Sequence, residues 1–143
     1  MKPQVITAEE LKELMDWRRE VLTEVFGVEP NEYVMEANKE YFTTEHFSSS
    51  FVLDRGKKVG CGIVCFQREL PSPDNINGKC AYLMNIYVKK DYRGRGFGTK
   101  LVNLLVEVAR AEGCCKIYLE STDGARELYS RLGFKPLDNI MKL

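Results

Sequence analysis

The sequence has no excess of charge of either sign, because its 21 basic and 21 acidic residues cancel over 143 positions. A neutral chain has no overall field to attract nucleic acid or an anionic membrane, so we expect neither partner. No apolar run approaches the roughly 20 residues of a membrane span. The start, Met1-Lys2-Pro3-Gln4, leads into amphipathic sequence without an apolar signal core. We therefore expect a cytoplasmic protein.

Metal-ligating residues are also scarce. His46 is the only histidine, and the five cysteines contain no C-x-x-C pair. These absences predict that the chain has no metal site. The cysteines are odd in number and include the adjacent Cys114-Cys115. We expect reduced thiols, most of them in the core, and no disulfide framework.

The remaining composition is that of an ordinary globular chain, 44% hydrophobic and 29% charged. A length of 143 residues suffices for one domain with a real core, so residues 1–143 are expected to form a single domain.

Hydrophobic spacing, caps and turn residues predict an α/β fold with a mixed sheet. The expected segments are a helix from its Thr7 cap to Phe26, a helix over 32–41, strands over 51–53, 58–66 and 81–88, a helix carrying Leu101 to Ala109, a strand over 116–119, a helix over 125–132, and a final strand over 134–143. The stretch from Val59 to Phe66 is apolar on both faces, which indicates a central strand. The polar loop from Arg68 to Lys79 is either functional or a simple surface excursion.

The strand–helix–strand unit from Ala81 to Leu119 predicts a parallel pair joined by a right-handed crossover. Ligands of open α/β sheets bind beyond the carboxyl ends of such strands. The segment Arg93-Gly94-Arg95-Gly96-Phe97-Gly98 falls at that edge.

Three features make this glycine-rich segment a candidate phosphate site. Its glycines remove side chains where a ligand must approach the backbone. The helix that follows begins with amides that have no internal partner and carry partial positive charge. Basic side chains surround it: Lys89, Lys90, Arg93, Arg95 and Lys100. A glycine-rich helix start without a ligand is the alternative.

Two other phosphate loops do not fit. A Walker A loop requires a glycine at position 93, where the chain has arginine. A dinucleotide fingerprint starting at Gly94 requires glycine at position 99, where the chain has threonine.

The segment from Val88 to Leu101 resembles motif A of the GNAT superfamily of N-acetyltransferases, whose core is Q/R-x-x-G-x-G/A. Arg93, Gly96 and Gly98 fill its defined positions. The segment from Ala125 to Phe134 is similar to the family's motif B, with one helix and one strand between the two motifs. The resemblance extends over nearly the whole chain.

This resemblance implies the GNAT fold, in which the two parallel strands splay apart at their carboxyl ends and acyl-CoA lies in the gap. The pantetheine arm would bond to the backbone of the first strand, and the diphosphate would lie on the amides of the glycine loop. The implied cofactor-binding residues are Ile86, Tyr87, Val88, Arg93, Gly94, Arg95, Gly96, Phe97, Gly98 and Thr99.

The resemblance also implies that Tyr129, in motif B, is the acid that protonates the departing CoA thiolate; the alternative is a core aromatic residue. Glu120 and Glu69 are candidate bases, or else surface carboxylates. Asn85 either orients a water or the substrate, or satisfies a buried hydrogen bond. Many relatives have an asparagine that contacts the cofactor where this chain has Asp123-Gly124.

The implied function is direct transfer of an acetyl group from acetyl-CoA to a primary amine, on a small molecule or a peptide, in a ternary complex. The alternatives are a non-catalytic CoA-binding module and a nucleotide-binding domain. Acidic residues at 24, 29, 32 and 69 suit a cationic acceptor. A homodimer is a further expectation, since dimers are common in the superfamily.

Overall fold

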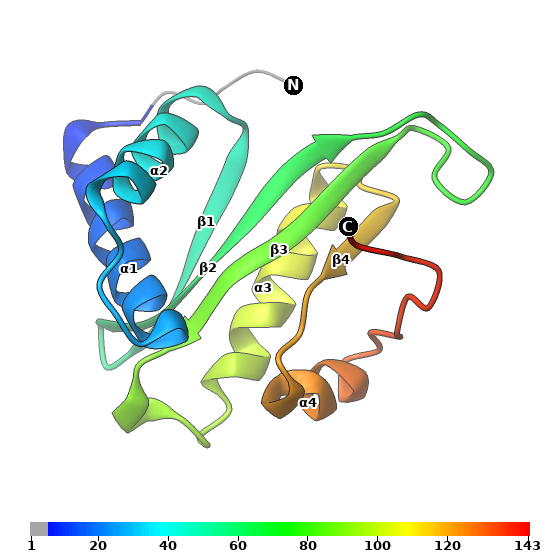
Figure 1. Cartoon of the computed structure of the whole chain (residues 1–143). Coiled ribbons are helices and arrows are strands. Elements are labelled where there is room, and N and C mark those ends of the chain that lie inside the picture. Colours follow the sequence, from blue (N-terminus) through cyan, green and yellow to red (C-terminus); the bar gives the residue numbers. More distant parts are fainter. Residues whose placement is uncertain (1–5) are drawn as a thin grey trace.

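The computed structural model describes residues 6–143, so the expectation about Met1–Gln4 lies outside the described residues. Four strands form one sheet, and helices cover both of its faces (Figure 1). The elements are α1 (Ala8–Phe26), α2 (Glu32–Thr44), β1 (Phe47–Asp54), β2 (Lys57–Arg68), β3 (Lys79–Val88), η1 (Lys90–Tyr92), α3 (Phe97–Ala111), β4 (Lys116–Leu119), η2 (Asp123–Ala125) and α4 (Arg126–Arg131).

The boundaries of α1 follow from its caps. The backbone N–H of Glu10 donates to Thr7 Oγ1 at 3.1 Å, which satisfies one of the free amides of the first turn. Gly27 ends the helix in the left-handed conformation, with φ of 75°. Both ends agree with the prediction from sequence.

Helix α2 is three residues longer than predicted, ending at Thr44 rather than Tyr41. The side chain of Asn31 accepts from the Val34 N–H and caps its start. Its buried residues are Met35 and Phe42, whereas Tyr33 is 90% exposed. The sequence alone did not show which face is inward, because both faces carry apolar side chains.

The strand order is β1-β2-β3-β4, with antiparallel pairing except between β3 and β4, which are parallel. Strand β2 is central, as predicted, and is buried from Val59 to Phe66. Gly62 allows α3 to pack closely, because a Cβ at this position would lie 2.7 Å from Leu105 Cδ1. Such a separation is too short for a real Cβ contact, so a side chain at position 62 would force the Leu105 side chain to shift.

The helices lie in two layers. Figure 1 shows α1 and α2 together on one side of the sheet and α3 against the other. Alternate residues of β2 serve the two cores. Val64 and Phe66 belong to the core under α3, and Ile63 and Cys65 belong to the core under α1 and α2.

The predicted final strand is wrong, because residues 134–143 contain no strand. Phe134 packs against the Tyr129 ring with centroids 5.9 Å apart. Beyond it, Leu137, Ile140 and Met141 are all exposed, so no buried apolar face stabilises an added strand. Pro136 also lacks the N–H that a sheet ladder needs.

The loop after β2 folds back on itself through a bridge between Ser72 and Asn75. Asn77 Nδ2 donates to the Gly113 carbonyl at 2.7 Å, which ties the loop to the start of β4. Figure 1 shows this loop and the glycine loop at opposite ends of the sheet. The loop therefore lies far from the predicted phosphate site.

None of the helices formed by residues 6–143 combines the length and apolar character that crossing a membrane would require.

Candidate active site

The parallel strands part where the sequence analysis expected. The last β3–β4 pair is Leu83 with Leu119, and β3 then continues to Val88 without a β4 partner. On its other edge β3 stays paired with β2 as far as Gly60 and Val88. Five residues of β3, 84–88, therefore present a backbone edge to the gap.

A β-bulge interrupts β3 inside this open segment. Cys61 pairs with Tyr87, and Ile63 pairs with Met84. Two residues of β3, 85 and 86, therefore lie opposite the single β2 residue 62. Asn85 lies in the bulge with φ of 58°, in the left-handed region. Asparagine tolerates that region better than other non-glycine residues, and bulges re-aim side chains near active sites. The polar residue in an apolar strand was the only sequence signal of the bulge.

The Asn85 side chain is held by the protein. Its Oδ1 accepts from Arg18 Nη1 at 2.9 Å, and its Nδ2 donates to Cys61 Sγ at 3.9 Å. Arg18 Nε donates in turn to Asn38 Oδ1 at 2.8 Å. This chain of bonds links α1, α2 and the bulge, and sequence reasoning did not identify Arg18 or Asn38.

A pocket of about 280 Å³ opens beside this network. It lies between α1, α2 and the middle of β2 and β3. Its lining residues are Arg18, Val34, Ala37, Asn38, Tyr41, Phe42, Ile63, Cys65, Met84 and Asn85. Met84 and Asn85 are also the first β3 residues after the last pair with β4. The pocket and the gap between the strands therefore meet on β3.

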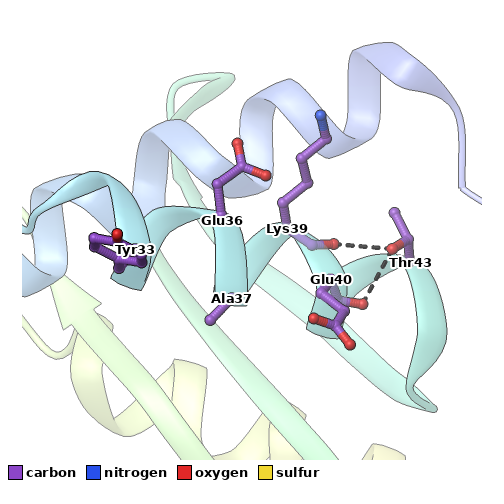
Figure 2. Close-up of a pocket in the computed structure, with 6 residues that line it drawn as sticks. All are labelled: Tyr33, Glu36, Ala37, Lys39, Glu40 and Thr43. Atoms are coloured by element: carbon purple, nitrogen blue, oxygen red, sulfur yellow. Dashed lines mark hydrogen bonds between the residues drawn. The ribbon is translucent and has the colours of Figure 1, made fainter.

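A second hollow lies on the outside of α2 and is unrelated to the strand gap. Figure 2 shows that its six labelled residues all come from α2. The Thr43 hydroxyl donates to the Lys39 and Glu40 carbonyls of the same helix. No strand residue lines this hollow, so it is not part of the candidate active site.

The glycine loop presents free amides at the start of α3. Gly94 and Gly96 have φ of 73° and 87°, a region that favours glycine. Gly96 caps α3 without a side-chain hydrogen bond, and its carbonyl accepts from Lys100 N–H. Within residues 6–143 the amides of residues 94–99 have no protein acceptor. These amides lie at the positive end of a 15-residue helix, where the partial positive charge favours an anion.

Acidic residues neutralise much of the predicted basic patch. Lys89 pairs with Glu20 at 2.9 Å, and Arg95 pairs with Asp54 at 3.3 Å. Lys90 and Lys100 are exposed and pair with no carboxylate of the described residues. The loop therefore keeps its backbone amides free, whereas Lys89 and Arg95 are paired with carboxylates.

Arg93 performs a structural task. Its Nη2 contacts both Glu24 oxygens at 2.6 Å, and its Nε donates to the Val88 carbonyl at 2.8 Å. The hydrogen bond that Arg93 donates to Glu24 raises the pKa of Arg93. Arg93 thus fastens the end of β3 to α1.

The other predicted cofactor-binding residues line the path between the gap and the loop. Ile86, Tyr87 and Val88 are half-buried on the open segment of β3. Burial, followed by the carboxylates of Glu20 and Glu24, raises the pKa of Tyr87 to about 12. Phe97 packs against Tyr92 at a centroid distance of 6.2 Å, next to the half-buried Gly98 and Thr99.

Tyr129 lies on α4 beside the start of α3. It is 9% exposed, and its neighbour Leu128 would contact a Cβ on Gly98 at 3.6 Å. No side chain or backbone group of residues 6–143 hydrogen-bonds to its hydroxyl. Burial raises the pKa of Tyr129, so its phenol stays protonated at neutral pH.

The two candidate bases lie at opposite ends of β4. Glu120 is exposed immediately after β4, at the strand gap. Burial and then the Glu120 carboxylate raise the pKa of Tyr82 to about 12. Glu69 lies near the start of β4, where it accepts from Asn75 and Lys116, and these contacts lower the pKa of its carboxyl. The structure therefore separates Glu69 from the gap.

Most of the acidic side chains that were expected to suit a cationic amine are paired with basic side chains of the protein. Glu24 pairs with Arg93, Glu32 with Arg19 at 3.7 Å, and Glu69 with Lys116. Asp123, at the position where relatives have asparagine, is exposed in η2.

Comparison with known proteins identifies the fold. The chain is similar over 96% of its length to a solved structure of a predicted acetyltransferase with acetyl-CoA from Clostridium acetobutylicum, with a TM-score of 0.84, 22% identity and 92% of that chain covered. It also resembles a putative acetyl transferase from Pyrococcus furiosus, with a TM-score of 0.71 and 23% identity over 95% of this chain and 94% of that one.

Two curated relatives are similar in sequence. Thialysine N-epsilon-acetyltransferase from Bos taurus is 38% identical over 82 residues, which are 55% of this chain and 45% of that protein. Glucosamine 6-phosphate N-acetyltransferase from Trypanosoma brucei brucei is 34% identical over 88 residues, which are 62% of this chain and 58% of that protein. The chain thus matches about half the length of these relatives. The model of the acetyltransferase (GNAT) family matches residues 11–134, and the chain belongs to that family.

Proposed function

We propose that this protein transfers an acetyl group from acetyl-CoA directly to a primary amine in a ternary complex. The observation that carries the proposal is the open β3 edge at residues 84–88, which leads to the free amides of residues 94–99. An extended pantetheine arm can add to such an edge as an extra strand. A diphosphate matches the amide cluster at the helix start.

The thioester would then lie near the Asn85 bulge, between the gap and the pocket. An acceptor held in the pocket, with its amine directed to the strand gap, would attack the thioester carbonyl carbon, forming the new C–N bond. Collapse of the tetrahedral intermediate breaks the C–S bond, and the electron pair leaves on sulfur. Tyr129 is the proposed acid for that thiolate, and its raised pKa keeps the proton available.

The acceptor must lose a proton before it attacks, because an ammonium ion has no lone pair. An unperturbed lysine-like amine has a pKa near ~10.4, so most of it is protonated at pH 7. Glu120, at the mouth of the gap beside Tyr82, is our candidate for accepting this proton. The names of two relatives, a thialysine N-epsilon-acetyltransferase and a glucosamine 6-phosphate N-acetyltransferase, support an amine substrate.

The test is release of CoA thiol from acetyl-CoA with a panel of primary amines. Turnover with at least one amine supports the proposal. Tight CoA binding without turnover on any amine would favour a CoA-binding module. Calorimetry that found ATP bound more tightly than CoA would favour a nucleotide-binding domain.

We also propose that residues 1–143 form one N-acetyltransferase domain. We further propose that the protein is a homodimer and that it acts in the cytoplasm. The free thiols of all five cysteines support a reducing compartment. Size-exclusion chromatography with light scattering measures the oligomeric state directly.

A further inference from the structure

We propose that the acceptor carries an anionic group, a carboxylate or a phosphate, and that Arg18 binds it in the pocket beside Asn85. This inference rests on the proposed function and specifies its substrate class.

The first argument is that Arg18 has no anionic partner. Its two side-chain bonds go to neutral amide oxygens, those of Asn38 and Asn85. Among residues 6–143 no carboxylate pairs with it. A guanidinium has five N–H donors and is always charged, so two bonds leave donors and a full charge available. The neighbouring arginine on α1, Arg19, does pair with a carboxylate, that of Glu32.

The second argument is the burial of this charge. Arg18 is half-buried, and its burial lowers the pKa of its guanidinium. Removing a charge from water is costly unless an opposite charge or several hydrogen bonds compensate for it. A bound anion would supply both, because carboxylate and phosphate oxygens match the guanidinium fork.

The third argument is that nothing else in the pocket is charged. The remaining lining residues are apolar, amide-bearing, or weak acids. Tyr41 and Cys65 are the titratable ones, and burial raises the pKa of each, so both are neutral at pH 7. An ammonium group placed here would meet a like charge and no compensating carboxylate.

The size of the pocket indicates a small acceptor. Its volume of about 280 Å³ lies just below the roughly 300–1,000 Å³ of sites for drug-sized ligands.

The position of Arg18 also supports the inference. Arg18 donates a hydrogen bond to Asn85, the bulge residue at the strand gap. An anion bound to Arg18 would therefore hold an acceptor close to the proposed thioester.

The experiment compares amines that differ only in the anion. Lysine is paired with 1,5-diaminopentane, and glucosamine 6-phosphate with glucosamine. We expect the anionic member of a pair to have a kcat/KM about 10- to 100-fold higher, the range of a charge-assisted hydrogen bond. Arg18→Gln should remove this preference mainly through KM. Arg19→Gln removes the same charge one residue away, outside the pocket, and should retain the preference.

The outcomes separate this inference from the proposed function. Turnover with equal or better use of the neutral member overturns the anion site and leaves the acetyltransferase proposal standing. A preference that survives in Arg18→Gln overturns the role of Arg18. The thermal midpoint and CoA affinity of Arg18→Gln show whether the variant is folded.

If none of these four amines is acetylated, the wider amine panel decides the proposed function, and binding decides the inference about Arg18. Calorimetric titration of the CoA-loaded protein with glucosamine 6-phosphate and glucosamine should then show tighter binding of the phosphate. That difference should be lost in Arg18→Gln and reduced in Arg18→Lys, since an ammonium keeps the charge but lacks the planar fork. Equal binding of the two sugars would overturn the inference.

Discussion

Arg18 and Asn85 lie 67 positions apart in the sequence and are joined by a 2.9 Å hydrogen bond from the guanidinium to the amide oxygen. The bond connects α1 to the bulge at which β3 leaves β4. The bond fixes the side chain of Asn85, which lies between the pocket and the strand gap. The network also contains Asn38 of α2, so three elements share one polar cluster. Its geometry is the basis for assigning the acceptor side of the site.

Replacing Tyr129 by phenylalanine should lower kcat by about 10²- to 10⁴-fold, the usual contribution of a positioned general acid. CoA affinity should change little, because the ring and its contact with Phe134 remain. Steady-state kinetics and calorimetry measure the two effects. Tyr33→Phe, at a residue that is 90% exposed, removes a hydroxyl far from the gap and serves as the control. An unchanged kcat would exclude Tyr129 as the acid.

Replacing Gly96 by alanine should weaken CoA binding at least tenfold and cost about 1–2 kcal/mol of stability, because φ at this position is 87°. Gly27→Ala is a matched control, since Gly27 has φ of 75° and also has open space around its Cβ position. It should lose similar stability without losing CoA affinity. Equal affinity losses in both variants would contradict the assignment of the loop.

Replacing Glu24 by glutamine should strengthen CoA binding several-fold at low ionic strength, because it frees the Arg93 guanidinium near the proposed diphosphate site. The gain should shrink at high salt, where exposed charges are screened. Stability should fall by no more than about 1 kcal/mol, as both partners are partly exposed. Calorimetry at two salt concentrations measures the effect, with Glu36→Gln on the outer face of α2 as control.

The stability of the fold should decrease between pH 9 and pH 12. Burial raises the pKa of Cys61 from 9.0 to about 12, so in this range the unfolded chain loses a proton that the folded chain keeps. The folded state binds more protons there, and linkage then makes stability fall as pH rises. In thermal melts at several pH values, the melting temperature should fall less steeply with rising pH in Cys61→Ala than in the exposed control Cys115→Ala. Identical slopes would mean that Cys61 does not contribute.

The local features of this protein were predictable from its sequence. The Thr7 cap and Gly27 stop of α1 and the bounds of β4 agree with the structure, because each depends on residues within a few positions. The glycine loop belongs to this group too, since a helix start exposes its amides whatever surrounds it. The order of these elements, with the two family motifs, also sufficed to identify the GNAT fold.

Long-range packing decided the rest. The ion pairs that occupy Lys89 and Arg93 come from α1, far away in sequence, so a list of basic residues overstated the charge at the loop. The predicted final strand does not form, because an apolar segment is stable as a strand only where another element buries its side chains. In the sequence, Arg18 looks like one more surface charge on an amphipathic helix. Only the tertiary structure shows that it lies beside Asn85 and has no carboxylate partner among residues 6–143. Backbone geometry is set by neighbours in the chain, whereas the electrostatics of a site depend on which distant side chains share it.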